Sequence, residues 1–170
     1  MTSNFNAMKD AIIIGIDVGS NGALACNSNG LVEVYRFNRI GESVEEVLNL
    51  LVVRAIENDW DIRALVEKVN ATPQMGVTSA FTFGENKGRV YGALRALKIP
   101  FEEILPRTWQ LPLNLPKPPP RTATKQQKQA YKLQHKRDLY KKAKDLFPFH
   151  ATTADTADAL LIMNHLIKQL

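Results

Sequence analysis

The chain has 170 residues, a length typical of one domain. Hydrophobic residues make up 45% and charged residues 23%, which is the balance of a globular protein and excludes a disordered or fibrous one. No apolar run approaches the ~20 residues of a membrane span, and the N-terminus lacks the basic start of a signal peptide, so we expect no membrane contact. The single cysteine, Cys26, excludes an internal disulfide and a cysteine-based zinc site and favours a reducing, cytoplasmic setting.

The formal net charge of +5 is concentrated in one segment. Residues 117–144 contain ten Lys or Arg residues and one acid, Asp138, which leaves 12 basic and 16 acidic residues elsewhere. A basic cluster on a slightly acidic body is typical of a protein that binds a polyanion. The alternative is a solvated helix face that serves solubility alone.

Three strands are predicted at the start of the chain. Residues 11–18 (AIIIGIDV) are nearly all apolar and predict a strand buried on both faces. Residues 22–28 and 31–37 predict two more strands, joined by Asn29-Gly30. Both residues of this pair tolerate positive φ, so the pair predicts a hairpin and the three strands an antiparallel meander.

Helices and strands are expected to alternate in the middle of the chain. Ser43 can cap a helix, with Glu46 as its capping-box partner. Residues 63–69 predict a strand parallel to the first, because a helical crossover separates the two. Residues 71–79 are expected to form a loop. The hydrophobic spacing predicts a helix over 81–97 and a strand over 99–106.

The last third is expected to hold an insertion and two helices. Residues 112–120 (PLNLPKPPP) should be neither helix nor ladder strand, because proline lacks the N–H. A polar helix is expected over 123–146, and a last helix after His150 with Thr152 or Thr153 as N-cap. The order βββαβαβ…α with a central parallel pair predicts the RNase H-like fold, an α/β class with a mixed five-stranded sheet flanked by helices. We expect one RNase H-like domain over 1–170, with a Pro-rich and basic insertion at about 112–145.

Two strands each carry an acidic residue where charge is costly to bury. Asp17 lies near the end of the first strand, between Ile16 and Val18, and shares a face with Gly15 and Gly19, because neighbouring strand residues face opposite sides. Glu67 is the acid within Leu65–Val69, and it can lie beside Asp17 if these strands pair. The alternatives are a turn aspartate bonded to the backbone and an exposed edge-strand glutamate.

Asp155 and Asp158 are three residues apart, so in a helix they project from one face. Acids in a first turn also favour the helix dipole, which is the alternative reason for their presence. The apolar residues around them suggest that they face the sheet instead. Carboxylates from three distant segments are the hard oxygen ligands that Mg²⁺ selects, and Mn²⁺ should be able to substitute. The four acids together therefore predict a metal site.

The segments IIIGIDVGSNGALA, ALVEKV and ADTADALLI resemble the three acidic motifs of the RuvC-type Holliday-junction resolvases, a family of the RNase H-like superfamily. The stretch GENKGRVYGAL (84–94) resembles the glycine-containing helix of that family. The resemblance implies that Asp17, Glu67, Asp155 and Asp158 bind catalytic metal. Members often carry an aromatic residue three positions after the strand glutamate, where this chain has Asn70.

The resemblance implies a homodimer in the cytoplasm of a bacterial or virus-infected cell. It would bind four-way or other branched DNA and nick two strands through metal-activated water, leaving a 5′-phosphate and a 3′-hydroxyl. The basic segment would hold DNA phosphates along one stripe, because most of its spacings are three or four. The residues expected to bind DNA are Lys117, Arg121, Lys125, Lys128, Lys132 and Lys136.

Three other functions use the same residues. The first is another RNase H-like nuclease that acts on RNA or on an RNA–DNA hybrid. The second is an actin-like ATPase or sugar kinase, because GIDVGSNGA resembles the phosphate loop of those proteins, although 170 residues are too few for their two domains. The third is a DNA-binding module without catalysis, which should lack one of the acids, whereas this chain has all four.

Overall fold

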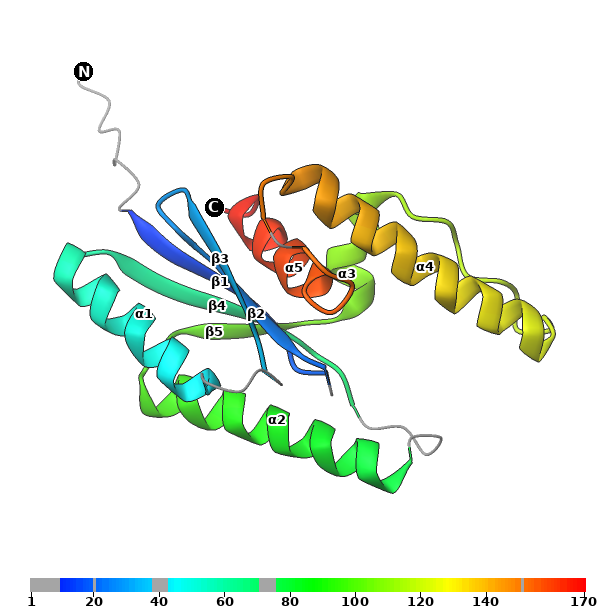
Figure 1. The fold of residues 1–170 in the computed structure, drawn as a ribbon, viewed down its shortest axis with the longest axis horizontal. Coiled ribbons are helices and arrows are strands. Elements are labelled where there is room, and N and C mark those ends of the chain that lie inside the picture. Colours follow the sequence, from blue (N-terminus) through cyan, green and yellow to red (C-terminus); the bar gives the residue numbers. More distant parts are fainter. Residues whose placement is uncertain (1–9, 20, 38–42, 71–75, 151) are drawn as a thin grey trace, which may run out of the picture.

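A computed structural model describes residues 10–19, 21–37, 43–70, 76–150 and 152–170. A five-stranded sheet in the order β3-β2-β1-β4-β5 forms its centre (Figure 1). The pairs β1–β2 and β2–β3 are antiparallel, whereas β1–β4 and β4–β5 are parallel. The expected meander and parallel crossover are therefore confirmed. The strands are β1 (Ala11–Asp17), β2 (Ala23–Ser28), β3 (Leu31–Arg36), β4 (Asp61–Glu67) and β5 (Phe101–Ile104).

Helices cover both faces of the sheet (Figure 1). One face carries α1 (Val44–Asn58) and α2 (Val77–Ala96). The other carries α3 (Pro106–Gln110), the 3-10 helix η1 (Leu111–Leu113), α4 (Lys125–Leu146) and α5 (Ala157–Ile167). The buried side chains form two apolar clusters, one on each face, since successive strand residues point to opposite sides. The expected α/β class, a mixed sheet flanked by helices, is confirmed.

Local signals in the first half of the sequence predicted the correct turns and caps. Asn29 and Gly30 both have positive φ, at 51° and 95°, and they connect β2 to β3. The Ser43 hydroxyl accepts a hydrogen bond from the Glu46 N–H, and the Glu46 carboxylate accepts one from the Ser43 N–H, at 3.2 and 2.8 Å. The expected hairpin and capping box are both confirmed.

The second long helix begins earlier than its hydrophobic pattern predicted. α2 starts at Val77 instead of 81, so the prediction of a loop is wrong for 77–79, while 71–75 lie outside the described residues. Its N-cap, Gly76, makes no side-chain cap hydrogen bond. Val77 and Phe81 are 88% and 72% exposed, so the first turns carry no buried face and gave no periodic signal.

Two short helical segments were missed near the prolines. α3 was not predicted, and η1 contains Pro112, so the prediction that 112–120 holds no helix is wrong for its first two residues. Both segments place proline in the first two helical positions. Proline is tolerated there because the N–H groups of a first turn have no intrahelical partner. From 114 to 120 the chain has no helix or strand, as expected.

The last helix begins later than expected. α5 starts at Ala157 with Thr156 as N-cap, so neither Thr152 nor Thr153 is the cap, and Asp155 precedes the helix. Thr153 instead opens a turn, because its carbonyl accepts hydrogen bonds from the N–H groups of Thr156 and Ala157. The Thr156 hydroxyl accepts from the Thr153 N–H at 2.8 Å and closes this turn. No helix among the described residues is long and apolar enough to cross a membrane.

Candidate active site

The close contact of α5 with the sheet depends on Gly15 in the middle of β1. A Cβ atom there would lie 2.2 Å from the Met163 nitrogen and 2.4 Å from the Ala159 carbonyl oxygen. These distances are too short for any side chain, so glycine lets the helix backbone lie directly on the strand. As a result, the start of α5 and the end of β1 are held close together.

Asp17 and Glu67 end two neighbouring parallel strands. Ile16 of β1 is paired with Val66 of β4, so the next residue of each strand is one of the two acids. Both belong to the side of the sheet that faces α5, because Ile13 and Leu65, at even spacing from them, pack in the cluster around α5. Asp17 also accepts a hydrogen bond from the Gly19 N–H at 2.8 Å, so the turn interaction considered as an alternative is present as well.

Three of the four acids have raised pKa values, and burial is the largest cause for each. Burial, with the charges of Asp17 and Asp158, raises the pKa of Glu67 to about 8. Burial and the charge of Asp17 raise the pKa of Asp158 to about 7, against a smaller opposite effect of Lys136. Burial also raises the pKa of Asp17. These carboxyl groups are therefore close together and have too little positive charge around them.

Asp155 has a different environment from the other three acids. It lies in the turn before α5 and forms an ion pair with Arg36 at the end of β3. The expectation that it projects with Asp158 from one face of a helix is therefore wrong, although its charge does reach Asp17. Within the part of the chain that the structure describes, no three Asp, Glu, His or Cys side chains are arranged to hold one metal ion.

The donor set itself fits a divalent cation. Carboxylate oxygens are the ligands of Mg²⁺, and a cation among them would offset the repulsion that raises their pKa values. Asp17, Glu67 and Asp158 would provide these ligands. Asp155 would have to exchange its guanidinium partner for the metal to join them.

Trp109 contacts the site and was not expected there. Its side chain is 1% exposed and packs in the apolar cluster on the face of the sheet that carries α5. Its indole N–H also donates a hydrogen bond to Glu67 Oε1 at 3.0 Å. Sequence patterns could not show this, because 42 residues separate the two and the contact arises when α3 folds back over the end of β4.

A cleft of about 290 Å³ opens beside Asp17 and Glu67. Asn70 lines it, and so do Ser79 and Phe83 of α2. Phe83 is buried, whereas Phe81 is exposed. The cleft therefore runs from the acids to the first turns of α2.

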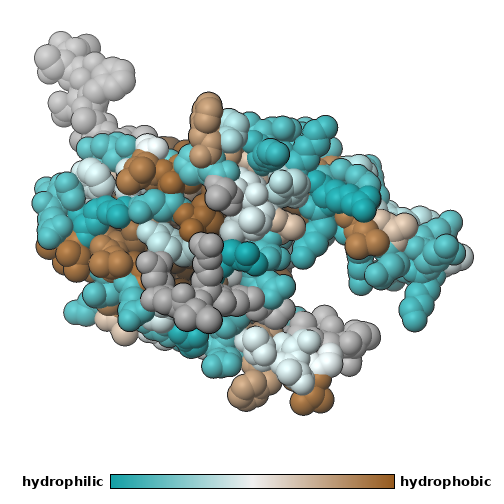
Figure 2. Space-filling view, viewed as in Figure 1, coloured by the Kyte–Doolittle hydropathy of each residue, from teal (hydrophilic) through white to brown (hydrophobic). Residues whose placement is uncertain are grey.

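The basic helix α4 has one lysine, Lys136, near the same site, and its other basic residues toward the N-terminus lie farther out. Figure 1 shows that the N-terminal part of α4 projects beyond the sheet, and Figure 2 shows its hydrophilic surface. Leu139 and Ala143, on the part that packs against the body, are buried. Lys132 and Lys136 continue this same helical face at spacings of four and three toward the projecting end. The Lys136 charge lowers the pKa of both Asp17 and Asp158, so this lysine is near the acids.

The other basic residues predicted to bind DNA lie along the same arm. Lys125, Lys128 and Lys132 are exposed residues of α4, whereas Lys117 and Arg121 are exposed residues of the segment before it. The Lys128 ammonium donates to the Arg121 carbonyl at 2.7 Å, which joins that segment to the helix. We call the segment 117–136 the basic arm.

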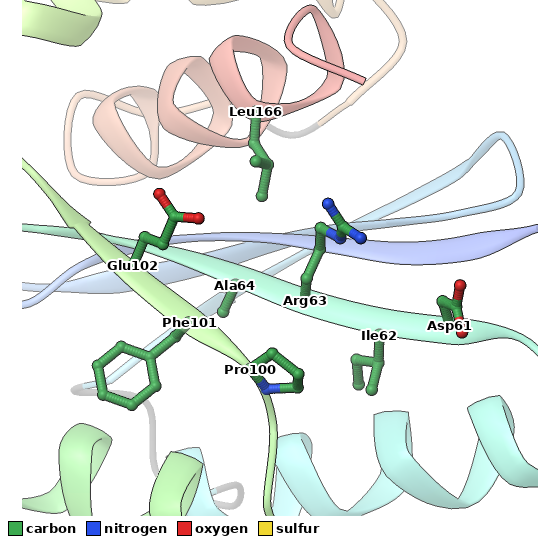
Figure 3. A pocket seen from close by; sticks show the side chains of 8 residues that line it. All are labelled: Asp61, Ile62, Arg63, Ala64, Pro100, Phe101, Glu102 and Leu166. Carbon is green, nitrogen blue, oxygen red and sulfur yellow. The ribbon is translucent and has the colours of Figure 1, made fainter. Parts of the chain in front are cut away.

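A pocket at the other end of the sheet contains none of these residues (Figure 3). Its volume is about 430 Å³, and it lies where β4 and β5 begin, whereas Glu67 ends β4. Arg63 and Glu102 lie on the side of the sheet that faces Leu166 of α5, and Phe101 points to the opposite side. Its mixed lining does not resemble the acidic site.

Comparison with known proteins identifies the fold. No family model matches the chain, and no curated protein matches its sequence. The structure is similar to that of Thermus thermophilus RuvC in complex with a Holliday junction substrate, with a TM-score of 0.53 and 15% identity over 94% of this chain and 96% of that one. Similarity is weaker to a second Thermus thermophilus RuvC structure (TM-score 0.48, 17% identity, 93% and 96% coverage). The yeast mitochondrial Holliday junction resolvase Ydc2 has a TM-score of 0.43, with 15% identity over 98% of this chain and 80% of that one.

The chain thus has the RNase H-like fold of RuvC. The resemblance seen in the acidic motifs is confirmed at the level of the fold, over nearly the whole length of both chains. At 15% identity, this structural similarity establishes the fold and does not establish the activity.

Proposed function

We propose that the protein is a divalent-metal-dependent endonuclease that nicks branched DNA, with the four-way junction as its substrate. The observation that carries this proposal is the group of buried carboxyl groups, Asp17, Glu67 and Asp158, beside a basic arm. The fold of this chain is also similar to that of Thermus thermophilus RuvC, whose solved structure contains a Holliday junction substrate. A nuclease needs these two features together, negative ligands for cations and positive charge for the DNA backbone.

The proposed roles follow from the position of each acid. Asp17 and Glu67, fixed at the ends of rigid strands, and Asp158, at the start of α5, would hold Mg²⁺ or Mn²⁺. The metal would supply Lewis acidity at the scissile phosphate and lower the pKa of water that attacks it. Asp155 would complete the ligands after leaving Arg36, and Arg36 would then be free to contact a phosphate oxygen. The products would be a 5′-phosphate and a 3′-hydroxyl.

The basic arm would bind the DNA next to the cleavage site. Lys136 is near the acids, while the residues toward Lys125 lie progressively farther out along the helix. One DNA arm could therefore run along α4 with its scissile phosphate at the carboxylates. Affinity should fall steeply with salt, because each lysine–phosphate contact releases counterions.

A homodimer would provide the two active sites that paired nicks require. Gly84, Gly88 and Gly92 of α2 are exposed, and a Cβ added to any of them would meet nothing within 4 Å. With the exposed Val77 and Phe81 they form a face that a second α2 could approach closely. The single-domain organisation over 1–170 and the cytoplasmic location remain predictions.

The test is cleavage of a labelled four-way junction beside a linear duplex, a fork and an RNA–DNA hybrid of matched sequence. Each substrate is incubated with Mg²⁺, with Mn²⁺ and with chelator. Paired metal-dependent nicks near the crossover, absent from the duplex, are expected. Asp158→Asn should still bind the junction, with the affinity that wild type has in chelator, and should lose cleavage, whereas Asp145→Asn, on exposed α4 surface, should behave as wild type in both assays.

Two other outcomes would replace the proposal. Preferential cleavage of the hybrid or of RNA would retain the acidic site and assign it to another RNase H-like nuclease. Junction binding without cleavage under any metal condition would indicate a non-catalytic DNA-binding module.

A further inference from the structure

Trp109 is placed to orient one carboxylate of the site. Its indole N–H donates to Glu67 Oε1 at 3.0 Å, and both side chains are buried, at 1% and 7% exposure. We propose that Trp109 is a positioning residue, which holds the Glu67 carboxylate in the orientation that binds the metal. This inference rests on the proposed function, because it assigns a role at the same site.

The hydrogen bond from Trp109 to Glu67 does more than give the buried indole N–H an acceptor. A buried N–H needs an acceptor, but a backbone carbonyl would satisfy it without bringing a tryptophan to the acids. Here the acceptor is the carboxylate that ends β4 at the acidic site, and the indole donor is fixed at one of its two oxygens. A fixed donor at one oxygen limits the orientations in which this carboxylate can bind a cation.

The geometry also restricts how the carboxylate can turn. Glu67 is the last residue of β4, and the next residue, Lys68, is fixed by a backbone hydrogen bond to Ile104 at the end of β5. The chain then continues through Leu105 into α3, which returns Trp109 over the end of β4. With Oε1 held by the indole, the other carboxylate oxygen is left for the cation. Partners that orient metal ligands in this way commonly change metal affinity by about 10- to 100-fold when removed.

The same short helix is connected to the basic arm. Gln110, the residue after Trp109, hydrogen-bonds through its side chain to the His135 ring of α4 at 3.1 Å. The His135 ring in turn stacks on Tyr131, whose hydroxyl donates to the Pro116 carbonyl at 3.1 Å. α3 is thus fixed on both sides, by the sheet and by α4. Trp109 therefore has a firm base from which to hold Glu67.

The experiment compares Trp109→Phe with Trp60→Phe. Phenylalanine keeps most of the apolar volume and removes the N–H, so the first change deletes the contact with Glu67. Trp60 packs in the other apolar cluster, on the face of α1 and α2, and is the matched control. Mn²⁺ binding to the DNA-free protein is measured from the electron paramagnetic resonance signal of free Mn²⁺. We expect Trp109→Phe to weaken Mn²⁺ binding by about tenfold and Trp60→Phe to leave it unchanged.

A second measurement requires no change at Trp109. In the Trp60→Phe protein, Trp109 is the remaining tryptophan, and paramagnetic Mn²⁺ bound at Glu67 should quench its selectively excited fluorescence. The Mn²⁺ concentration at half-maximal quenching should match the midpoint of the paramagnetic resonance titration. Adding Glu67→Gln to the Trp60→Phe protein should abolish the quenching. In Trp109→Phe, the emission of Trp60 should not respond.

The outcomes separate this inference from the proposed function. If the wild-type protein binds no Mn²⁺, the metal site itself is refuted. If the wild type binds Mn²⁺ but Trp109→Phe binds it equally well, or Trp109 emission ignores Mn²⁺, only the positioning role is refuted. A Trp109→Phe protein that unfolds leaves the fluorescence result of Trp60→Phe to decide.

Discussion

Replacing Glu67 with glutamine should stabilise the metal-free protein at alkaline pH. Glutamine keeps an oxygen that can accept the Trp109 hydrogen bond and removes the buried charge. The folded-state pKa of Glu67 is raised from 4.5 to about 8 by burial and by the charges of Asp17 and Asp158. Below pH 4.5 the side chain is protonated in both states, so the two proteins should have similar free energies of unfolding.

The pH dependence follows from the direction of this shift. As the pH rises from about 4.5 to about 8, the unfolded chain loses the Glu67 proton and the folded chain keeps it, so wild-type stability falls. Above pH 8 the Glu67 carboxyl is ionised in both states, so the loss of wild-type stability no longer grows. At about 1.4 kcal/mol per pKa unit, the interval from 4.5 to about 8 corresponds to roughly 5 kcal/mol. Because water that enters around the charge lowers this value, we expect an advantage of about 2–5 kcal/mol for Glu67→Gln at pH 9.

The assay is urea unfolding followed by circular dichroism at pH 4.5 and pH 9 with chelator present. Glu57→Gln, on the exposed surface of α1, is the control and should stay within about 0.5 kcal/mol of wild type at both pH values. Adding Mg²⁺ at 100 times its dissociation constant should stabilise wild type by about 2.7 kcal/mol and leave Glu67→Gln unchanged. An advantage below about 1 kcal/mol at pH 9 would refute the placement of Glu67 among buried acids.

Three further changes test the arrangement around the site. Gly15→Ala would place a Cβ 2.2 Å from the Met163 nitrogen, so the free energy of unfolding of this variant should fall by about 3 kcal/mol. Urea unfolding would measure this change. A loss under about 0.5 kcal/mol would contradict the close approach of α5 to β1. Lys132→Gln should reduce the slope of log affinity against log salt for junction DNA by about 1, whereas Lys141→Gln, on the opposite side of α4, should leave the slope unchanged. If the two variants have equal slopes, the basic arm does not contact the DNA. Gly88→Glu, on the exposed face of α2, should give a monomer in sedimentation and convert paired nicks to single ones, and an intact dimer would place the interface elsewhere.

Local chemistry made much of the fold predictable. An apolar strand that ends in Asp17 and a strand that ends in Glu67 each indicate burial next to charge, and the helix between them implies a parallel pair. The structure joins both acids at one edge through that pairing. The Ser43 capping box and the Asn29-Gly30 turn are equally local, and both were predicted at the correct residues.

The features that were missed depend on contacts between distant segments. Trp109 reaches Glu67 because α3 folds back over β4, and five residues of α3 carry no periodic pattern of their own. Arg36 pairs with Asp155 across 119 residues. The start of α5 was misplaced because three threonines precede the helix, and Thr153 forms a turn whose N–H and carbonyl bond to Thr156 and Ala157 and leave Thr156 as the N-cap.

The buried acids lower the stability of the metal-free protein at neutral and alkaline pH, and the basic groups nearest to them offset part of this cost. Three carboxyl groups with raised pKa values oppose folding, and well-packed apolar residues at the same positions would not. The fold offsets part of this with Lys136 beside Asp17 and Asp158, and with Arg36 on Asp155. A cation bound among the acids would supply the remaining positive charge. The side chains of Lys136 and Arg36 would then be free to contact DNA phosphates. Metal binding should therefore strengthen DNA binding, and DNA that engages Lys136 should in turn raise the affinity for metal, since linkage is reciprocal.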